Sequence, residues 1–191
     1  MNSAWPAWAW LAINTTACGP HANSSITEHN DYCTGPAPNQ FGPGTEKPTV
    51  PLPTAVDLIR ICHYSESVLP ELDTVETIGA GGLDVEYNDN LMSLEPAALR
   101  SIQTRLTVEA NSLRILKLAS LGYVGDLWID SNTLLDTLVL PDTLQTFGAV
   151  MIHDNPRLPQ CQVQKIVDQL RAHGLPSTYL TTGNDETATC P

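Results

Sequence analysis

The chain has 191 residues, of which 21 are acidic and 9 basic, so its formal net charge is −12. Its length and its apolar content of 42% are sufficient for one domain with a hydrophobic core. The charge balance disfavours nucleic acid and anionic membrane surfaces as partners, because both are bound through basic patches. No apolar run in the sequence reaches the ~20 residues of a membrane-spanning helix.

The N-terminal segment favours export. The apolar run Ala4–Ile13, AWPAWAWLAI, is followed by small residues, and we interpret residues 1–17 as a possible signal segment. A signal peptide normally has Lys or Arg ahead of this run, and here there is none. The alternatives are a true start further upstream and a segment with another role. Residues 16–19, TACG, loosely match a bacterial lipoprotein cleavage site, which makes Cys18 a candidate for lipidation.

Cysteine usage also favours export. The five cysteines form no CxxC pair, a distribution more typical of disulfides than of a zinc or thioredoxin-like site. If Cys18 carries lipid, the other four pair as Cys33–Cys62 and Cys161–Cys190. The alternative is a Cys18–Cys33 bridge that leaves Cys62 buried and free.

Residues 18–54 are rich in Pro and Gly and lack periodicity, so we interpret them as a linker or tail. A repeat begins at about residue 55, with the pattern apolar-x-apolar-x-x-Asn. Its starts fall at residues 59, 83, 106, 127, 150 and 179. The first copy, Ile59 and Ile61, has Tyr64 in the Asn slot, and the last copy, which begins at Tyr179, is weak.

The repeat predicts a mainly β solenoid of about five to six coils over residues 55–191. Each apolar-x-apolar pair is a short strand, and stacked strands build a continuous core that a single strand lacks. The repeated Asn tolerates a tight bend, and its side chain bonds to nearby backbone. We therefore expect an asparagine ladder made of Asn88, Asn111, Asn132, Asn155 and Asn184.

The end of the chain predicts a cap. Val163, Ile166, Val167 and Leu170 have helical spacing, and Gly174 is a plausible stop. A solenoid exposes core at its last coil, so we expect residues 160–191 to cover it with an α-helix. A Cys161–Cys190 bridge would hold this cap in place.

The segments GGLDVEYNDNLMSL, TRLTVEANSLRIL, GDLWIDSNTLLDTL and GAVMIHDNPRLPQC resemble the leucine-rich-repeat-like receptor L domain, over roughly residues 55–191. The closing segment looks like the end of bacterial cell-envelope members. The resemblance implies a short right-handed β-helix-like solenoid with parallel sheets, used for binding and not for catalysis.

Stacking of the coils aligns outward residues into two columns. The first column contains Arg60, Asp84, Thr107, Trp128, Met151 and Leu180, and the second contains Cys62, Glu86, Glu109, Asp130, His153 and Thr182. Adjacent like charges destabilise a sheet, so the acidic column of Glu86, Glu109 and Asp130 suggests a binding surface. A solvated face on an acidic protein is the alternative. His153 extends this column and could pair with Asp130, and we predict no metal site.

Trp128, Met151 and Leu180 form an apolar strip of the kind that marks contact sites, unless the cap helix or a loop covers it. The sequence contains no GxSxG, HExxH or GxxxxGK[ST] motif. We therefore expect a non-catalytic binding or adhesion domain without cofactors, exported to the cell envelope or secreted, with a protein or glycan ligand. The alternatives are a polysaccharide-acting β-helix enzyme and a purely structural envelope protein.

Overall fold

The computed structural model describes residues 40–41, 51–174 and 178–190. The predicted signal segment 1–17, Cys18, Cys33 and most of the linker 18–54 lie outside this range. Within the predicted linker, strand β1 (Gln40–Phe41) pairs with β2 (Ala55–Cys62), and Phe41 and Leu52 are buried in the core. The linker assignment therefore does not hold for these residues.

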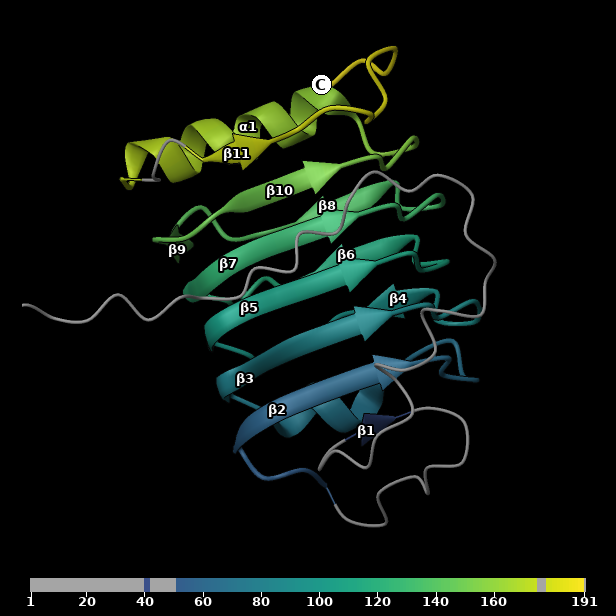
Figure 1. Cartoon of the computed structure of the whole chain (residues 1–191), viewed down its shortest axis with the longest axis vertical. Coiled ribbons are helices and arrows are strands. Elements are labelled where there is room, and N and C mark those ends of the chain that lie inside the picture. The colour runs from purple at the N-terminus through teal and green to yellow at the C-terminus, as the bar shows by residue number, and fades with distance from the viewer. Residues whose placement is uncertain (1–39, 42–50, 175–177, 191) are drawn as a thin grey trace, which may run out of the picture. The chain divides into compact units, whose positions relative to one another are not determined.

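The described residues form a mainly β solenoid in which successive coils stack in parallel (Figure 1). The larger sheet has the order β1-β2-β3-β5-β7-β10-β11, with β9 beside β7, and the smaller sheet has the order β4-β6-β8. The remaining strands are β3 (Thr77–Glu86), β4 (Ser93–Leu94), β5 (Ser101–Glu109), β6 (Ile115–Lys117), β7 (Tyr123–Asp130), β8 (Thr137–Val139), β9 (Gln145–Thr146), β10 (Val150–His153) and β11 (Tyr179–Leu180).

The predicted fold class is confirmed, although the solenoid makes about four turns. The expectation of five to six coils was too high because the last predicted copy forms only the 2-residue strand β11, and the strands β2, β3, β5, β7 and β10 of the other copies are separated by four turns. In the first coil a 3-10 helix, η2 (Pro70–Thr74), precedes β3.

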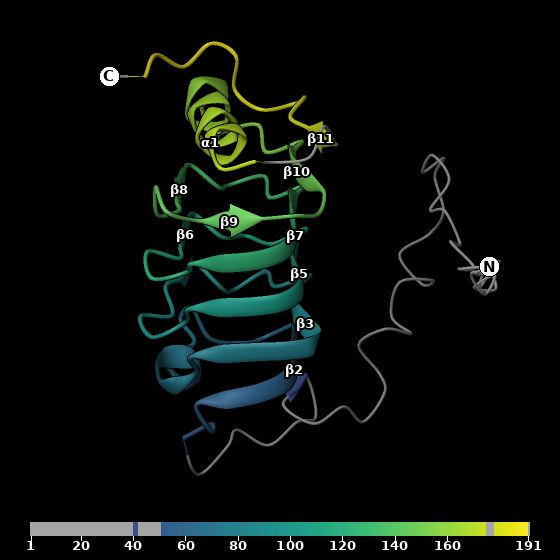
Figure 2. The same cartoon turned by 90° about the vertical axis from the view of Figure 1, so that its left-hand side faces the viewer.

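The long strands of the larger sheet bend partway along their length. The pairing register shifts between Val56 and Leu58, and corresponding shifts occur in the next two strand pairs. Figure 2 shows these strands stacked along the solenoid, with the helix at its C-terminal end. Gly125 lies at the bend of β7, where a Cβ would come within 2.0 Å of the Thr104 carbonyl oxygen, so a larger residue does not fit.

The apolar residues of the repeat form the core. The pairs that begin at Ile59, Leu83, Leu106, Leu127 and Val150 all have both members at 0% exposure. Tyr179, the weak last copy, is 40% exposed because it belongs to the final coil. For these pairs burial follows the alternation that the sequence pattern predicted. Two of the residues predicted to face outward, Cys62 and Thr107, are also buried, with exposures of 0% and 6%.

The five predicted asparagines form a continuous buried ladder. In each step the Oδ1 atom of one Asn accepts a hydrogen bond from the backbone N–H of the preceding Asn, as from Asn111 to Asn132 at 3.0 Å. The Nδ2 atom donates to a carbonyl of the preceding coil, as from Asn132 to Val108 at 2.9 Å. Polar backbone groups that the turn buries are therefore satisfied by the next coil.

Tyr64, in the first Asn slot, is bonded to the ladder through its backbone. The backbone N–H of Tyr64 donates to Asn88 Oδ1 at 2.8 Å, so the first coil uses the ladder without contributing an Asn. An Asn in this slot would act on the turn that follows β1, and that turn lies outside the described residues.

The residue before each slot has a left-handed backbone. His63, Tyr87, Ala110, Ser131 and Asp154 have φ between 51° and 56°, and Gly183 has φ of 75°. For an L-residue this conformation costs about 1–2 kcal/mol. The left-handed conformation recurs at every turn because it directs the following residue inward to the ladder.

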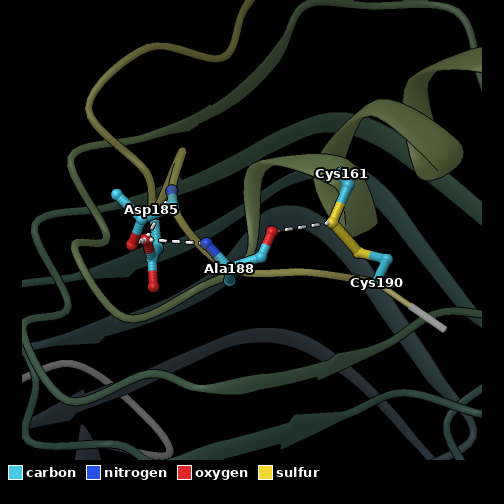
Figure 3. Close-up of a disulfide and its surroundings, with 5 residues drawn as sticks. Cys161, Asp185, Ala188 and Cys190 are labelled. Carbon is cyan, nitrogen blue, oxygen red and sulfur yellow. Dashed lines mark hydrogen bonds between the residues drawn. A yellow bond between two sulfur atoms is a disulfide. The ribbon is translucent and has the colours of Figure 1, made fainter.

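Helix α1 (Gln160–Ala172) caps the C-terminal end, as predicted. Its buried residues are Val163, Ile166, Val167 and Leu170, the four with helical spacing. The predicted Cys161–Cys190 disulfide is present, with the two Cα atoms 6.0 Å apart (Figure 3).

We predict that Asn132→Ala lowers the free energy of unfolding by about 2–4 kcal/mol, because it leaves the buried Asn111 N–H and Val108 carbonyl without partners. Chemical denaturation monitored by circular dichroism measures this change. Asn90→Ala, at an exposed asparagine outside the ladder, should stay within about 0.5 kcal/mol of the parent. Equal costs for both variants would contradict a structural role for the ladder.

We also predict that Ala110→Gly raises the free energy of unfolding by about 0.5–1 kcal/mol, because Gly removes the left-handed strain. Ala98 does not have a positive φ. Ala98→Gly should therefore lower the free energy of unfolding by about 0.4–1 kcal/mol, because Gly increases the conformational entropy of the unfolded chain. Urea titrations of the two variants should give changes in the free energy of unfolding with opposite signs. A lower free energy of unfolding in both variants would refute the prediction.

Candidate ligand-binding face

The first outward column is aligned by the strand register. Consecutive Cα partners run from Arg60 through Asp84, Thr107, Trp128 and Met151 to Leu180. The N-terminal part of the column, on β2 and β3, is polar, and the Arg60 guanidinium lies 3.6 Å from the Asp84 carboxylate. The C-terminal part, on β7, β10 and β11, is the apolar strip of Trp128, Met151 and Leu180.

The second outward column is aligned in the same way from Cys62 through Glu86, Glu109 and Asp130 to His153. Strand β11 ends at Leu180, so Thr182 lies beyond the paired residues, and its carbonyl accepts from Asp154 N–H at 2.9 Å. Cys62 is completely buried and disulfide-bonded, so the alternative of a free thiol is wrong. The predicted partner of Cys62, Cys33, lies outside the described residues.

The acidic column brings like charges together on neighbouring strands. Glu86 is the Cα partner of Glu109, which is in turn the partner of Asp130, and adjacent strands lie about 4.8 Å apart. Burial, followed by the charges of Asp84, Glu109 and Asp130, raises the pKa of Glu86 to about 7, against an opposing effect of Arg60. Glu86 therefore changes its charge near neutral pH.

Asp84, in the neighbouring column, is also perturbed. Burial raises the pKa of Asp84 above its usual value, although the Arg60 guanidinium and a hydrogen bond with Thr107 act to lower it. Burial outweighs the ion pair here, because desolvation penalises the charged form more than the nearby cation stabilises it.

His153 pairs differently from the sequence expectation. Its Nδ1 atom lies 2.8 Å from the carboxylate of Asp154, the next residue along the chain, although Asp130 is its Cα partner on the neighbouring strand. Asp130 instead accepts a hydrogen bond from the Ser131 hydroxyl at 3.2 Å. The left-handed turn at Asp154 is not visible in the sequence pattern, which explains why the pair was missed.

The apolar strip contains a stacked cation that sequence reasoning did not identify. The Arg105 guanidinium lies 3.8 Å from the centroid of the Trp128 ring and 3.4 Å from the Asp126 carboxylate. Trp128 Nε1 is buried, and among the described residues it has no hydrogen-bond partner. Arg105 is the Cα partner of Asp126, two residues from Trp128, so a register-based search for diagonal neighbours would have found it.

The strip stays partly open. Trp128 and Met151 are half-buried, Leu180 is 39% exposed, and α1 lies across the end of the core (Figure 2). The alternative that the cap helix or a loop covers the strip completely does not hold, because Leu180 is exposed and Trp128 and Met151 are only half-buried. In the part of the chain that the structure describes, no three His, Cys, Asp or Glu side chains are grouped so that they could hold a metal ion.

None of the helices in residues 40–41, 51–174 and 178–190 has the length and hydrophobicity needed to cross a bilayer. Comparison of the chain with protein-family models, curated proteins and solved structures found no match.

The raised pKa of Glu86 predicts a pH-dependent stability difference between Glu86→Gln and the parent. The folded-state pKa lies above the ordinary value of 4.5, so ionisation of Glu86 opposes folding. The two proteins should be about equally stable near pH 4.5. The variant should become more stable by about 1–2 kcal/mol at pH 8, a figure reduced to allow for partial solvent screening.

Urea titrations at pH values from 4.5 to 8 measure this difference directly. Glu76→Gln, at an exposed carboxylate elsewhere, is the matched control and should show a change below about 0.5 kcal/mol throughout. A Glu86→Gln difference that shrinks as the pH rises would contradict the assigned direction.

Proposed function

We propose that this chain is a non-catalytic binding or adhesion domain that presents the outward face of its larger sheet to a macromolecular ligand. The observation that carries the proposal is the acidic column, in which Glu86, Glu109 and Asp130 are direct cross-strand neighbours. Such an arrangement is unfavourable in an isolated sheet. A ligand that brings positive charge to the column would relieve the repulsion, which supports a role in binding.

The neighbouring apolar strip supports a polypeptide ligand over a glycan. A partly open Trp and Met beside charged groups is typical of protein interfaces, where large anchors are flanked by polar contacts. Arg105 lies over the Trp128 ring and leaves less of the ring available for stacking against a sugar. The favoured ligand is a polypeptide segment that carries Lys or Arg next to an apolar side chain.

The sequence resemblance to leucine-rich-repeat-like receptor L domains of bacterial cell envelopes supports the same kind of function. The Cys161–Cys190 disulfide is compatible with export. In this proposal residues 1–17 direct secretion, and lipid on Cys18 anchors the domain to the envelope.

We predict that Glu86→Gln, Glu109→Gln and Asp130→Asn together weaken binding of a penta-lysine peptide at least tenfold without loss of the fold. The measurement is surface plasmon resonance at pH 8, where Glu86 is ionised. A printed glycan array, probed with the parent and with the triple variant, tests the alternative that the ligand is a glycan. The fold is checked by circular dichroism and by thermal unfolding.

The matched control is Asp73→Asn, Glu76→Gln and Asp89→Asn, which removes the same charge from exposed positions outside the column. Equal weakening in both triple variants would show that net charge, and not the acidic column, attracts the peptide. If the triple variant of the acidic column is more stable than the parent but binds the peptide equally well, the column has only a repulsive effect on the fold. That result would favour a purely structural protein. Polysaccharide turnover that the substitutions abolish would favour the enzyme.

A further inference from the structure

The final coil, Thr178–Cys190, is attached to the solenoid with little apolar burial. Asn184 is the only residue of this segment that is buried. Tyr179 and Leu180, which form β11, are 40% and 39% exposed. By contrast, the inward residues of the preceding strand β10 are completely buried.

Hydrogen bonds hold this coil instead. Asp154 N–H donates to the Thr182 carbonyl at 2.9 Å, and Asn155 N–H donates to Asn184 Oδ1 at 3.3 Å. Asp185 N–H donates to the Leu158 carbonyl at 2.9 Å. A segment with many hydrogen bonds and few apolar contacts opens locally at a lower free energy than the core does.

The Cys161–Cys190 disulfide closes this weakly held coil. Cys190 follows Asn184 by six residues in the chain. Cys161 lies in the first turn of α1, and the bond joins it to Cys190 over a sequence separation of 29 (Figure 3). The bond restricts the open state of the segment, because both of its ends then stay tethered to the helix that caps the solenoid.

The bond is accessible to thiol exchange from one side. Cys190 is exposed and Cys161 is half-buried, so we expect an external thiolate to attack the Cys190 sulfur. That attack forms a mixed disulfide on Cys190 and expels Cys161 as a thiolate, which the N-terminus of α1 stabilises. A second thiol resolves the mixed disulfide, and the products are two protein thiols and the oxidised reductant.

We propose that the Cys161–Cys190 bond is a redox latch: on reduction by a small thiol, the final coil opens and the outward face loses its upper edge. Leu180 then no longer packs beside Met151, and Asn155 loses its acceptor on Asn184. The consequence for ligand binding rests on the proposed function, whereas the opening itself does not.

Hydrogen–deuterium exchange of the full chain tests the opening. In the variant with both Cys161→Ser and Cys190→Ser, the amides of Asp154, Asn155 and Asp185 should exchange about 100-fold faster than in the oxidised parent. The amides of Asn88 and Asn111, deep in the ladder, should be unchanged. The double variant isolates this bond, because a reductant would also act on the disulfide of Cys62.

Thr189→Ser keeps the bond and serves as the matched control, with exchange like that of the parent. Equal acceleration at Asn88 and Asn111 would show a global loss of stability and overturn the latch. Exchange at Asp154 and Asn155 within threefold of the parent would overturn it as well.

Methionine oxidation reports on the face without any ligand. Hydrogen peroxide should oxidise Met151 several-fold faster in the double variant, whereas Met92, already 38% exposed, should react at an unchanged rate. Penta-lysine binding gives the remaining comparison. If the parent binds and the opened variant binds equally well, redox control of the face fails while the proposed function stands; if neither binds, the proposed function fails while the exchange result stands.

Discussion

The hydrogen bond from one asparagine to the backbone of the preceding coil is the constraint on which the solenoid depends. A coil this tight buries backbone groups at its corner, and a buried group without a partner is costly. Asn satisfies both kinds of group, because its amide carries an acceptor and donors on one short side chain. The apolar residues then stack in register, since each corner is fixed relative to the next.

The same register determines what the outward face contains. Because the ladder holds neighbouring coils in fixed alignment, side chains that share a slot become direct neighbours whether or not they attract each other. Glu86 and Glu109 are neighbours for this reason, and Asp84 receives Arg60 and Thr107 for the same reason. The register of the scaffold thus decides which outward side chains become neighbours, and the stability of the sheet depends in turn on how those neighbours interact.

Much of this architecture could be predicted from the sequence. A period-two apolar pair with a fixed Asn predicted the strands, the ladder and the two columns, and helical spacing predicted α1. The features that were missed depend on local backbone geometry. The left-handed residues share no side-chain type, so the pairing of His153 with Asp154 could not be found from the pattern.

Other features depend on long side chains. Arg105 contacts Trp128 diagonally between the adjacent strands β5 and β7, and no single column contains both residues. Strand β1 was missed because two residues in a Pro-rich stretch carry no periodic signal. Exposure of the apolar strip likewise depended on where the helix lies relative to the core, and helical spacing in the sequence does not determine that position.

The ladder has a direction, and this direction makes neighbouring coils depend on each other unequally. Each corner is completed by an asparagine that follows it by about one coil, as Asn111 completes the corner at Asn88. A truncation between these two residues would leave the buried Asn88 N–H without its acceptor, whereas the bond from Tyr64 N–H to Asn88 would still be available. Each corner therefore depends on the residues that come after it in the chain.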